Sequence, residues 1–361
     1  MKHYNIPIFI PHLGCPYECI YCNQRAIAAQ PEIPGLDQVQ YTVEQCLQTI
    51  PQEAHVQVAF FGGSFTAVDR QLQEDYLQAV QPYLRQGRVQ SIRISTRPDS
   101  IDEAALDLLA EYGVKTIELG VQSLSGRVLQ AAGRQYSPGM VCQSARLIQS
   151  RQFELGIQLM IGLPLDSHAQ DIETTRQVIA LRPESVRIYP TLVIAGTALE
   201  AMWNRGDYSP LSLDEAVATC RDMLLLLQRE NIRVIRMGLY PGEELLRDGV
   251  VKAGPFHPSF GELVEQEIFK AQARMGLIKF RKKYLSSTEI ELQVNFRDVS
   301  KMTGPNKKNL RELSQEFGLS SIKVKAEPGL DCNWVGIYRL GTDLNRLLIS
   351  RAEFMDWQGL K

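Results

Sequence analysis

Residues 6–24 read IPIFIPHLGCPYECIYCNQ, an apolar run followed directly by a loop that carries three cysteines. Cys15, Cys19 and Cys22 follow the spacing C-x3-C-x2-C, which places three soft thiolate ligands on one loop. The chain has seven cysteines, and an odd total with three of them clustered does not suit a disulfide framework. The pattern predicts a metal or redox site in a reducing compartment, and we therefore expect a cytoplasmic protein.

The composition is that of a globular protein, with 361 residues, 44% hydrophobic and 22% charged. The sequence contains no apolar run of about 18 residues, so we expect no membrane-spanning segment, and we see no signal-peptide pattern. The net charge of −2 argues weakly against a strong nucleic-acid binder. Residues 270–325, however, contain 13 lysines and arginines against 5 aspartates and glutamates. This asymmetry indicates either a polyanionic partner or an ordinary solvated face.

Short β-like runs alternate with longer amphipathic stretches, which predicts βα units and a parallel sheet. Nearly every run ends in a polar or glycine-rich cluster, and parallel barrels carry their active sites at these strand ends. An open doubly wound sheet would instead gather its ligand residues at one switch point. The six predicted strands, with a candidate seventh in last place, are 6–11, 55–63, 91–98, 115–123, 156–164, 185–193 and 232–240.

The pattern changes near residue 240, so we expect a barrel domain over residues 1–240 and a basic, mixed α/β region over 241–361. In the second region we predict three strands and two helices. The strands are KFRKKYL (279–285), IELQVNF (290–296) and SIKVKA (321–326). One helix is VEQEIFKAQARM (264–275), and the other runs from near Asn306 to Gly318. FRKKY interleaves aromatic and basic residues, as RNA-binding surfaces often do.

Two metal sites suit the cysteine loop. With His12 as a fourth ligand the three cysteines could bind one zinc ion, since structural zinc sites prefer four protein ligands. Alternatively, three cysteines could hold an iron–sulfur cube and leave its fourth iron open for a small chelating molecule. An open coordination position is typical of a reactive centre rather than a structural one.

The cysteine spacing, with Tyr21 directly before the last cysteine, resembles the signature of the radical S-adenosylmethionine (radical SAM) superfamily. The resemblance covers about residues 5–240. It implies a partial (β/α)6 barrel of the TIM type, a [4Fe-4S] cluster on Cys15, Cys19 and Cys22, and S-adenosylmethionine on the open iron. It further implies a 5′-deoxyadenosyl radical that removes a hydrogen atom, and a reductase, flavodoxin or ferredoxin as electron donor.

The same resemblance assigns further residues to the cofactor. Gly62 and Gly63 would allow the methionine amino group to approach the backbone, while Ser64 replaces the commoner acidic residue. Arg134 would pair with the methionine carboxylate, because a guanidinium binds a carboxylate through two hydrogen bonds. The ribose hydroxyls would meet Gln122 and Ser123, with Tyr21 also near the cofactor. An adenine slot would be lined by Met160, Ile161 and Tyr189, residues that could equally be barrel core.

Three longer phrases narrow the resemblance: FFGGSFT (60–66), IELGVQS (117–123) and VRIYPTLVIAGTALEAMWNRGDY (186–208). Together they look like the radical SAM core of the Elongator catalytic subunit, which implies modification of a tRNA base. We see no glycine-rich pyrophosphate loop after the core, so acetyl-CoA cleavage is not carried over. The alternative is a small-molecule substrate such as a porphyrin, because IELGVQS and a downstream arginine also resemble coproporphyrinogen dehydrogenases.

Charged residues outside these motifs supply candidates for substrate contacts. Arg187 lies within an apolar strand, where a charge is costly unless it is paired. Other candidates near strand ends are Arg97, Asp99, Arg233 and Arg236, although Asp99 could instead cap the next helix. In the basic region, Lys307, Lys308 and Arg311 lie at the start of the predicted helix, where they could meet RNA phosphates.

Overall fold

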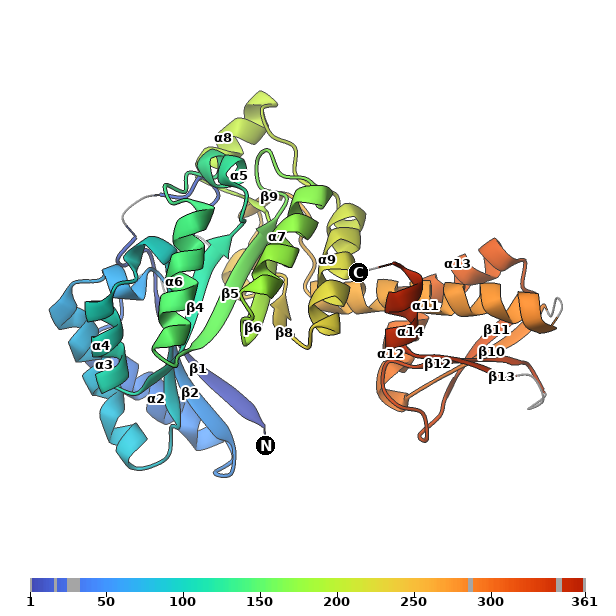
Figure 1. Cartoon of the computed structure of the whole chain (residues 1–361), viewed down its shortest axis with the longest axis horizontal. Coiled ribbons are helices and arrows are strands. Elements are labelled where there is room, and N and C mark those ends of the chain that lie inside the picture. The colour runs from blue at the N-terminus through green and yellow to red at the C-terminus, as the bar shows by residue number, and fades with distance from the viewer. Residues whose placement is uncertain (1, 16–17, 25–32, 285–287, 342–345, 360–361) are drawn as a thin grey trace. The chain divides into compact units, whose positions relative to one another are not determined.

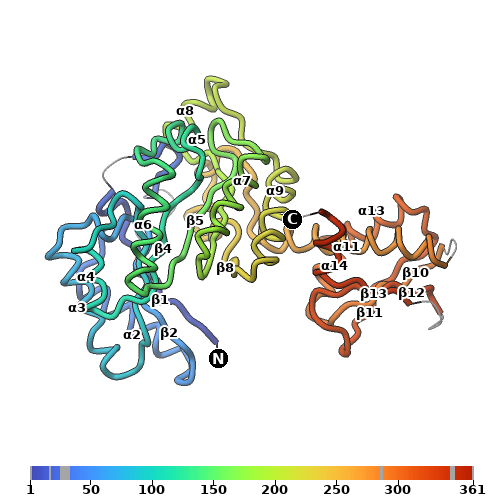
Figure 2. The backbone as a smooth tube through the Cα atoms, in the orientation of Figure 1, coloured from blue at the N-terminus to red at the C-terminus, as the bar shows by residue number. Residues whose placement is uncertain are grey.

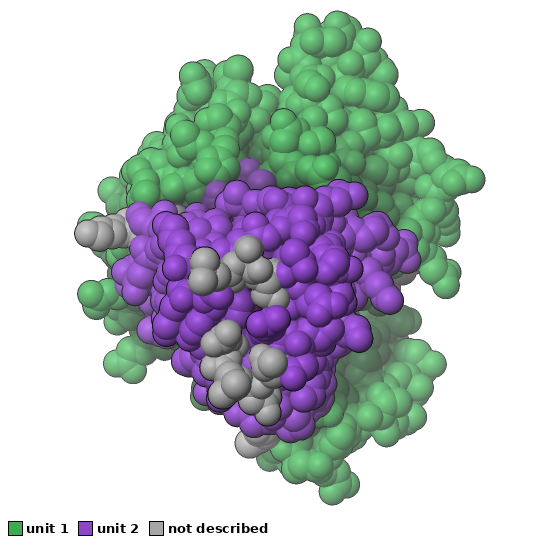
Figure 3. All heavy atoms as spheres, turned by 90° about the vertical axis from the view of Figure 1, so that its right-hand side faces the viewer, with its two compact units in different colours: residues 1–216, 232–258 green, residues 217–231, 259–361 purple. Residues whose placement is uncertain are grey.

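The protein was examined as a computed structural model that describes residues 2–15, 18–24, 33–284, 288–341 and 346–359 (Figure 1). The chain forms two compact units. The first contains residues 1–216 and 232–258, and the second contains residues 217–231 and 259–361 (Figure 3). The division therefore falls after residue 258, later than the boundary expected near residue 240, and part of one helix of the barrel region belongs to the second unit.

The first unit contains a seven-stranded sheet in the order β1-β2-β3-β4-β5-β6-β8, and each neighbouring pair is parallel. Its strands are β1 (His3–Ile10), β2 (His55–Gly62), β3 (Ser91–Thr96), β4 (Val114–Gln122), β5 (Glu154–Ile161), β6 (Ser185–Pro190) and β8 (Arg233–Met237). The predicted α/β class and partial barrel are confirmed, and β8 supplies the seventh strand. Neighbouring strands of this sheet follow one another in the sequence because the connection after each strand returns the chain to the end of the sheet at which the strands begin, next to the strand just formed.

Helices cover one face of this sheet, as Figure 1 shows for α4, α6 and α7. The helices of the unit are α2 (Leu36–Thr49), α3 (Arg70–Arg85), α4 (Glu103–Glu111), α5 (Gly126–Ala131), α6 (Pro138–Ser150), α7 (His168–Ala180), α8 (Ala198–Arg205), the start of α9 (Leu213–Arg229) and α10 (Glu243–Leu246). Valine, isoleucine and leucine from alternate strand positions fill this side, for example Ile94, Ile117 and Ile157. The polar residues of the strands therefore occupy the other face. A short two-stranded sheet, β7 (Val193–Ile194) and β9 (Val251–Ala253), completes the unit.

Helix α4 illustrates how local sequence sets these elements. The Asp102 side chain accepts a hydrogen bond from the backbone N–H of Ala105 at 2.8 Å and so caps the helix. Leu106 and Leu109 bury one face of it. Gly113 follows with a φ of 77°, a left-handed conformation that ends the helix at little cost for glycine.

The second unit combines one long helix with a four-stranded sheet in the order β11-β10-β12-β13 (Figure 2). Strands β10 and β11 are parallel, whereas β12 and β13 are antiparallel to their neighbours. The elements are α11 (Phe260–Tyr284), β10 (Glu289–Val294), α12 (Val299–Thr303), α13 (Lys308–Phe317), β11 (Ser321–Ala326), β12 (Val335–Arg339), β13 (Arg346–Ile349) and α14 (Arg351–Trp357). Helix α11 packs on β12 and β13.

The strand predicted over residues 279–285 is wrong, because α11 continues through Tyr284. Phe280 is 1% exposed and packs in the core on the same helix as Met275, so the first of the two aromatic residues of FRKKY is not available to an RNA surface, whereas Tyr284 is half-buried. Arg281, Lys282 and Lys283 lie in the last turn, where positive charge is favourable at the helix C-terminus. The alternation of aromatic and basic residues therefore reflects a helix end, not a strand.

We also find, among the helices in the described ranges, none with the length and apolarity needed to cross a membrane.

Candidate active site

The cysteine loop follows β1 and is held from two sides by backbone hydrogen bonds. The Ile20 N–H donates to the carbonyl of Ala132 at 3.3 Å, and the Ile20 carbonyl accepts from the N–H of Leu199 at 2.8 Å. Within the loop, the Cys22 N–H donates to the carbonyl of Cys19 at 3.0 Å and closes a turn. The loop is thus fixed between the segment after α5 and the start of α8.

The two glycines after β2 form the floor against which the cysteine loop packs. A Cβ on Gly63 would lie 2.0 Å from the carbonyl oxygen of Leu13, so only glycine fits there. Gly62 has a φ of 106°, which other residues rarely adopt. The Ser64 N–H donates to Leu13 at 2.8 Å and ties the two loops together. The physical reason for these glycines is therefore close contact with the cysteine loop, whereas their role beside a cofactor stays a prediction.

The three thiols are half-buried and interact electrostatically with one another. Burial, together with the neighbouring Cys19 and Cys15, raises the pKa of Cys22 to about 12, while Arg134 opposes the shift. Burial also raises the pKa of Cys15, with Cys19 adding to the effect. Such thiols give up their protons when a metal replaces them, since the thiolate is the metal-binding form.

Arg134 is buried beside this loop with one nitrogen unsatisfied. Its Nη2 and Nε donate to the hydroxyl of Tyr21 at 3.1 and 3.3 Å, so the predicted pair of cofactor residues is brought together. Its Nη1 is buried and makes no hydrogen bond within the described chain. Burial disfavours the cation, but the neighbouring Tyr21, Tyr136 and Cys19 raise the pKa of Arg134 above its ordinary value. A buried cation with a spare donor is a site for an anionic acceptor.

A second arginine, Arg97, lies close to Arg134 at the end of β3. Its Nε and Nη2 bind the two carboxylate oxygens of Asp99 at 2.9 and 2.7 Å. Asp99 therefore pairs with Arg97, while the cap of the next helix is Asp102. The ring of Tyr136 contacts both guanidinium groups, at 5.5 Å from Arg97 and 5.4 Å from Arg134. Sequence reasoning missed Tyr136, which no motif marks.

Gln122 and Ser123 lie at the end of β4, where the strand is irregular. The register to β5 shifts between Gly120 and Gln122, and Gln122 has a φ of 65°. The Ser123 hydroxyl accepts a hydrogen bond from the N–H of Ser125 at 3.2 Å and lies 3.4 Å from the hydroxyl of Thr174. Ser123 thus supports the turn, and a contact of either residue with a ribose stays a prediction.

The three residues proposed for an adenine slot do not share one face. Met160 pairs in register with Tyr189, and both are half-buried on the polar face of the sheet. Ile161 is 0% exposed and, as the next residue along β5, points to the helix-covered face. Met160 packs with Tyr21 against a cluster that contains Val128. Ile161 is therefore core, and Met160 remains the residue of the three nearest the cysteine loop.

A buried ionic network crosses the polar face of the sheet. Glu118, 1% exposed, binds Arg187 at 3.0 Å and accepts a hydrogen bond from Gln158 at 2.8 Å, and it also pairs with Arg93. Burial alone would raise the pKa of Glu118, but the two arginines hold it below its usual range. Gly156 leaves room for the carboxylate, since a Cβ there would lie 2.7 Å from its Cγ. Arg187, predicted to face the substrate, is thus paired across the strands.

The remaining predicted arginines are more peripheral. Arg233 forms an exposed ion pair with Glu184 at 3.1 Å. Arg236 lies over the ring of the exposed Tyr240, at 5.5 Å. Of the charged candidates from the sequence, Arg97 and Arg134 come together with the cysteine loop.

These residues fit an iron–sulfur cluster better than a single zinc ion. A zinc site would need His12 as its fourth ligand, and the Nε2 of His12 already accepts a hydrogen bond from the N–H of Gln24 at 3.0 Å. A cube spreads its cysteine ligands over different irons. Three mutually interacting thiols beside the unsatisfied Arg134 suit such a cluster and an anionic ligand.

Comparisons with known proteins agree with this geometry. A family model described as the Radical SAM superfamily matches residues 9–178, and one for the Radical SAM C-terminal domain matches residues 183–270. An uncharacterised protein of Methanocaldococcus jannaschii is 28% identical over 62% of this chain and 71% of its own length. The tRNA uridine(34) acetyltransferase of Dehalococcoides mccartyi is 26% identical over 57% of this chain and 52% of its own.

The human Elongator complex protein 3 is 30% identical over 54% of this chain and 40% of its own length, so the chain spans about half or less of these two named relatives. Among solved structures, the archaeal Elp3 of Methanocaldococcus infernus superposes with a TM-score of 0.60. That match has 21% identity and covers 81% of this chain and 70% of the other, which supports the fold. The cysteine loop, the half-barrel and both family matches lead to one conclusion: this chain is a member of the radical SAM superfamily, with its C-terminal domain.

Proposed function

We propose that this radical SAM enzyme modifies an RNA base, with the wobble uridine region of tRNA as the candidate substrate. Two kinds of observation support the proposal. The relatives named above include tRNA uridine(34) acetyltransferases, and the phrases at residues 60–66, 117–123 and 186–208 resemble the Elongator core. The chain matches only part of those relatives, so the proposal covers the radical step and not the acetyl transfer.

The observation that carries the proposed chemistry is the unsatisfied Nη1 of Arg134 beside the three cysteines. Cys15, Cys19 and Cys22 would hold three irons of a [4Fe-4S] cluster, and Arg134 would bind the carboxylate of S-adenosylmethionine. When bound, these groups supply one-electron cleavage of the sulfonium and a 5′-deoxyadenosyl radical for hydrogen-atom removal. A reductase, flavodoxin or ferredoxin would supply the electron.

This chain's own residues prepare the site in three ways. Tyr21 and Tyr136 fix the Arg134 guanidinium by a hydrogen bond and a ring contact. Burial keeps water away from the cation, so its attraction for an anion is weakly screened. On the polar face of the sheet, two arginines share the single carboxylate of Glu118, which leaves a net positive charge facing the interior. A positive interior suits a substrate that carries phosphates.

Nucleoside profiling of tRNA from a deletion strain tests the substrate. We expect one modified nucleoside of the anticodon loop to disappear, to return with the intact gene, and to stay absent with a variant lacking the three loop cysteines. Unchanged tRNA together with accumulated tetrapyrrole would replace the RNA proposal with the small-molecule alternative. Anaerobic protein that carries zinc, lacks iron and fails to cleave S-adenosylmethionine with dithionite would refute the radical chemistry itself.

A further inference from the structure

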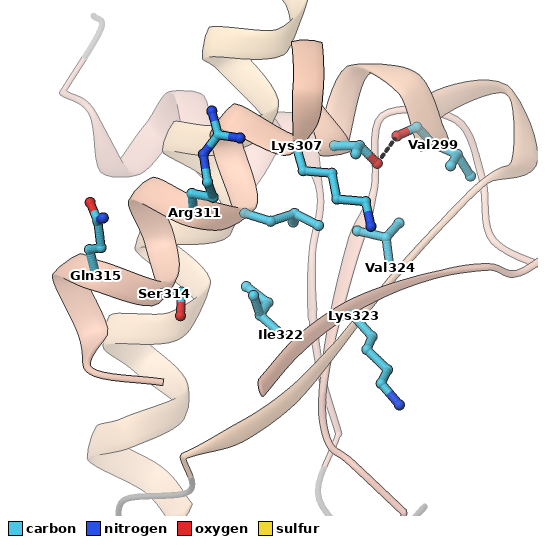
Figure 4. Close-up of a pocket in the computed structure, with 10 residues that line it drawn as sticks. Val299, Lys307, Arg311, Ser314, Gln315, Ile322, Lys323 and Val324 are labelled. Carbon is cyan, nitrogen blue, oxygen red and sulfur yellow. Dashed lines mark hydrogen bonds between the residues drawn. The ribbon is translucent and has the colours of Figure 1, made fainter. Parts of the chain in front are cut away.

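The second unit contains a groove of about 640 Å³ between helices α12 and α13 and strand β11 (Figure 4). Its floor is apolar and includes Leu310, Ile322 and Val324, and Lys307 and Arg311 line the side next to the loop between the two helices. The side chain of Lys323, which lies between Ile322 and Val324 on β11, points away from the groove (Figure 4). Figure 4 shows the Lys307 side chain extending over the groove toward Val324. An apolar floor with a cationic rim suits a ligand that has both flat apolar surfaces and negative charges.

The acidic residues of α13 are neutralised away from this groove. Glu312 binds the Nζ of Lys270 at 2.8 Å, and Glu316 binds the Nε of Arg274 at 2.5 Å. These two partners both come from α11, and neither glutamate lines the groove. Among the described residues that do line it, none is acidic. The described residues that line the groove therefore include cations and no carboxylate.

The loop between α12 and α13 reads Gly304-Pro305-Asn306-Lys307 and is fixed in place. A Cβ on Gly304 would lie 2.9 Å from Cγ of Asn309, whose amide donates to the carbonyls of Gln266 at 2.9 Å and Lys301 at 3.1 Å. Asn306 and Lys307 have φ values of 48° and 60°, the left-handed region that favours glycine. The chain thus maintains an unfavourable backbone in order to present Lys307 at the mouth of the groove.

The strand that forms the other wall is an edge strand. Strand β11 pairs with β10 only, in parallel, and β10 leads through α12, the loop and α13 back to β11. This β-α-α-β unit with a Gly-x-x-Lys turn between its helices is arranged as in KH modules, which clamp about four nucleotides of a single strand with a GXXG loop. Here Lys307 takes the place of the second glycine and keeps its left-handed conformation.

We propose that this groove binds a single-stranded RNA segment of about four nucleotides, with a phosphate at Lys307 of the loop and with bases against the apolar floor. The proposal deepens the proposed function by giving an RNA substrate a docking surface. It rests on that function only for the choice of RNA over DNA, because the shape and charge of the groove would suit single-stranded RNA and single-stranded DNA alike.

The test is fluorescence anisotropy of the full chain with a labelled single-stranded RNA octanucleotide, measured without S-adenosylmethionine at two salt concentrations. We compare the variant K307Q with the matched control K282Q, which removes the same charge from the exposed end of α11. Arg311 is left intact because its Nη1 bonds the carbonyl of Asn306. The groove variant should weaken binding about threefold and reduce the salt slope by about 0.7, as expected for one lost phosphate contact.

A second variant, N306D/K307D, places negative charge at the loop while its residues still tolerate left-handed backbone. It should abolish RNA binding and keep the wild-type melting temperature. Equal weakening by K282Q, tighter binding of duplex RNA, or displacement by polyglutamate at equal concentration would overturn the proposed groove. Equal affinity for DNA of the same sequence would overturn the choice of RNA as its ligand. Because no turnover is measured, RNA binding and the loss of a tRNA modification succeed or fail separately.

Discussion

Removal of the Glu118 carboxylate should destabilise the first unit far more than an ordinary surface substitution. Glu118 is 1% exposed and pairs with Arg93 and Arg187, which are themselves mostly buried. The substitution Glu118→Gln keeps the size of the side chain and its hydrogen bond from Gln158 but removes the charge. Two guanidinium groups would then lie in the interior without an anion.

The magnitude follows from the cost of an uncompensated buried charge. Breaking a buried ion pair by removing one partner costs about 3–5 kcal/mol. In hydrogen exchange this corresponds to amides of β4 and β5 exchanging about two to three and a half orders of magnitude faster. The triple variant E118L/R93M/R187M should recover most of the loss, because an apolar replacement of a whole buried network is often neutral or stabilising.

The assay is hydrogen exchange by mass spectrometry on the iron-free protein. Peptides of β10 in the second unit serve as the internal control, since Glu118 makes its contacts within the first unit. An exchange rate that rises less than tenfold in β4, or that rises equally in β10, would show that the Glu118 network does not stabilise the first unit as argued. A triple variant less stable than E118Q would contradict the account of the unpaired arginines.

The pH dependence provides an independent check on the same network. The pKa of Glu118 is lower in the folded protein than in the unfolded chain. The Glu118 carboxylate therefore stabilises the fold fully at a pH above its unfolded pKa, and this stabilisation is lost as the pH falls through the folded pKa. The difference in free energy of unfolding between wild type and E118Q should therefore be largest at neutral pH and should decrease in acid. A difference that stays constant between pH 7 and pH 3 would refute this sign.

Three further predictions concern the candidate site. Alanine in place of any one of the three loop cysteines should abolish the retention of about four irons per chain and the cleavage of S-adenosylmethionine, whereas C332A, at an exposed position in the second unit, should retain both in iron assays and product chromatography. Arg134→Lys keeps a charge but loses the planar fork, so the Kd for S-adenosylmethionine should rise about 10–100-fold at unchanged iron content, and an unchanged Kd would remove Arg134 from the site. Gly63→Ala should displace the cysteine loop and lower iron content, while Gly35→Ala, with no atom within 4 Å of the added Cβ, should not.

Local sequence was sufficient to predict a feature wherever the pattern was a periodic run of apolar residues or lay within a single loop. The strand runs, the Asp102 cap and Gly113 stop of α4, and the spacing of the cysteines needed only neighbouring residues. The prediction over 279–285 was wrong because a short stretch of alternating aromatic and basic residues suits a strand and a helix end equally. The burial of Phe280 on α11 decides between them, and burial is a tertiary property.

The sequence alone determined the class of chemistry and the α/β half-barrel, since the three cysteines lie within one loop and each βα unit is a pattern of consecutive residues. Only the tertiary structure brought Arg97 and Arg134 onto the ring of Tyr136, explained Gly63 by its contact with Leu13, and paired Arg187 with Glu118. The same holds for the groove beside Lys307. These contacts join residues far apart along the chain, and the interactions that hold them depend on distance and burial, which no local pattern encodes.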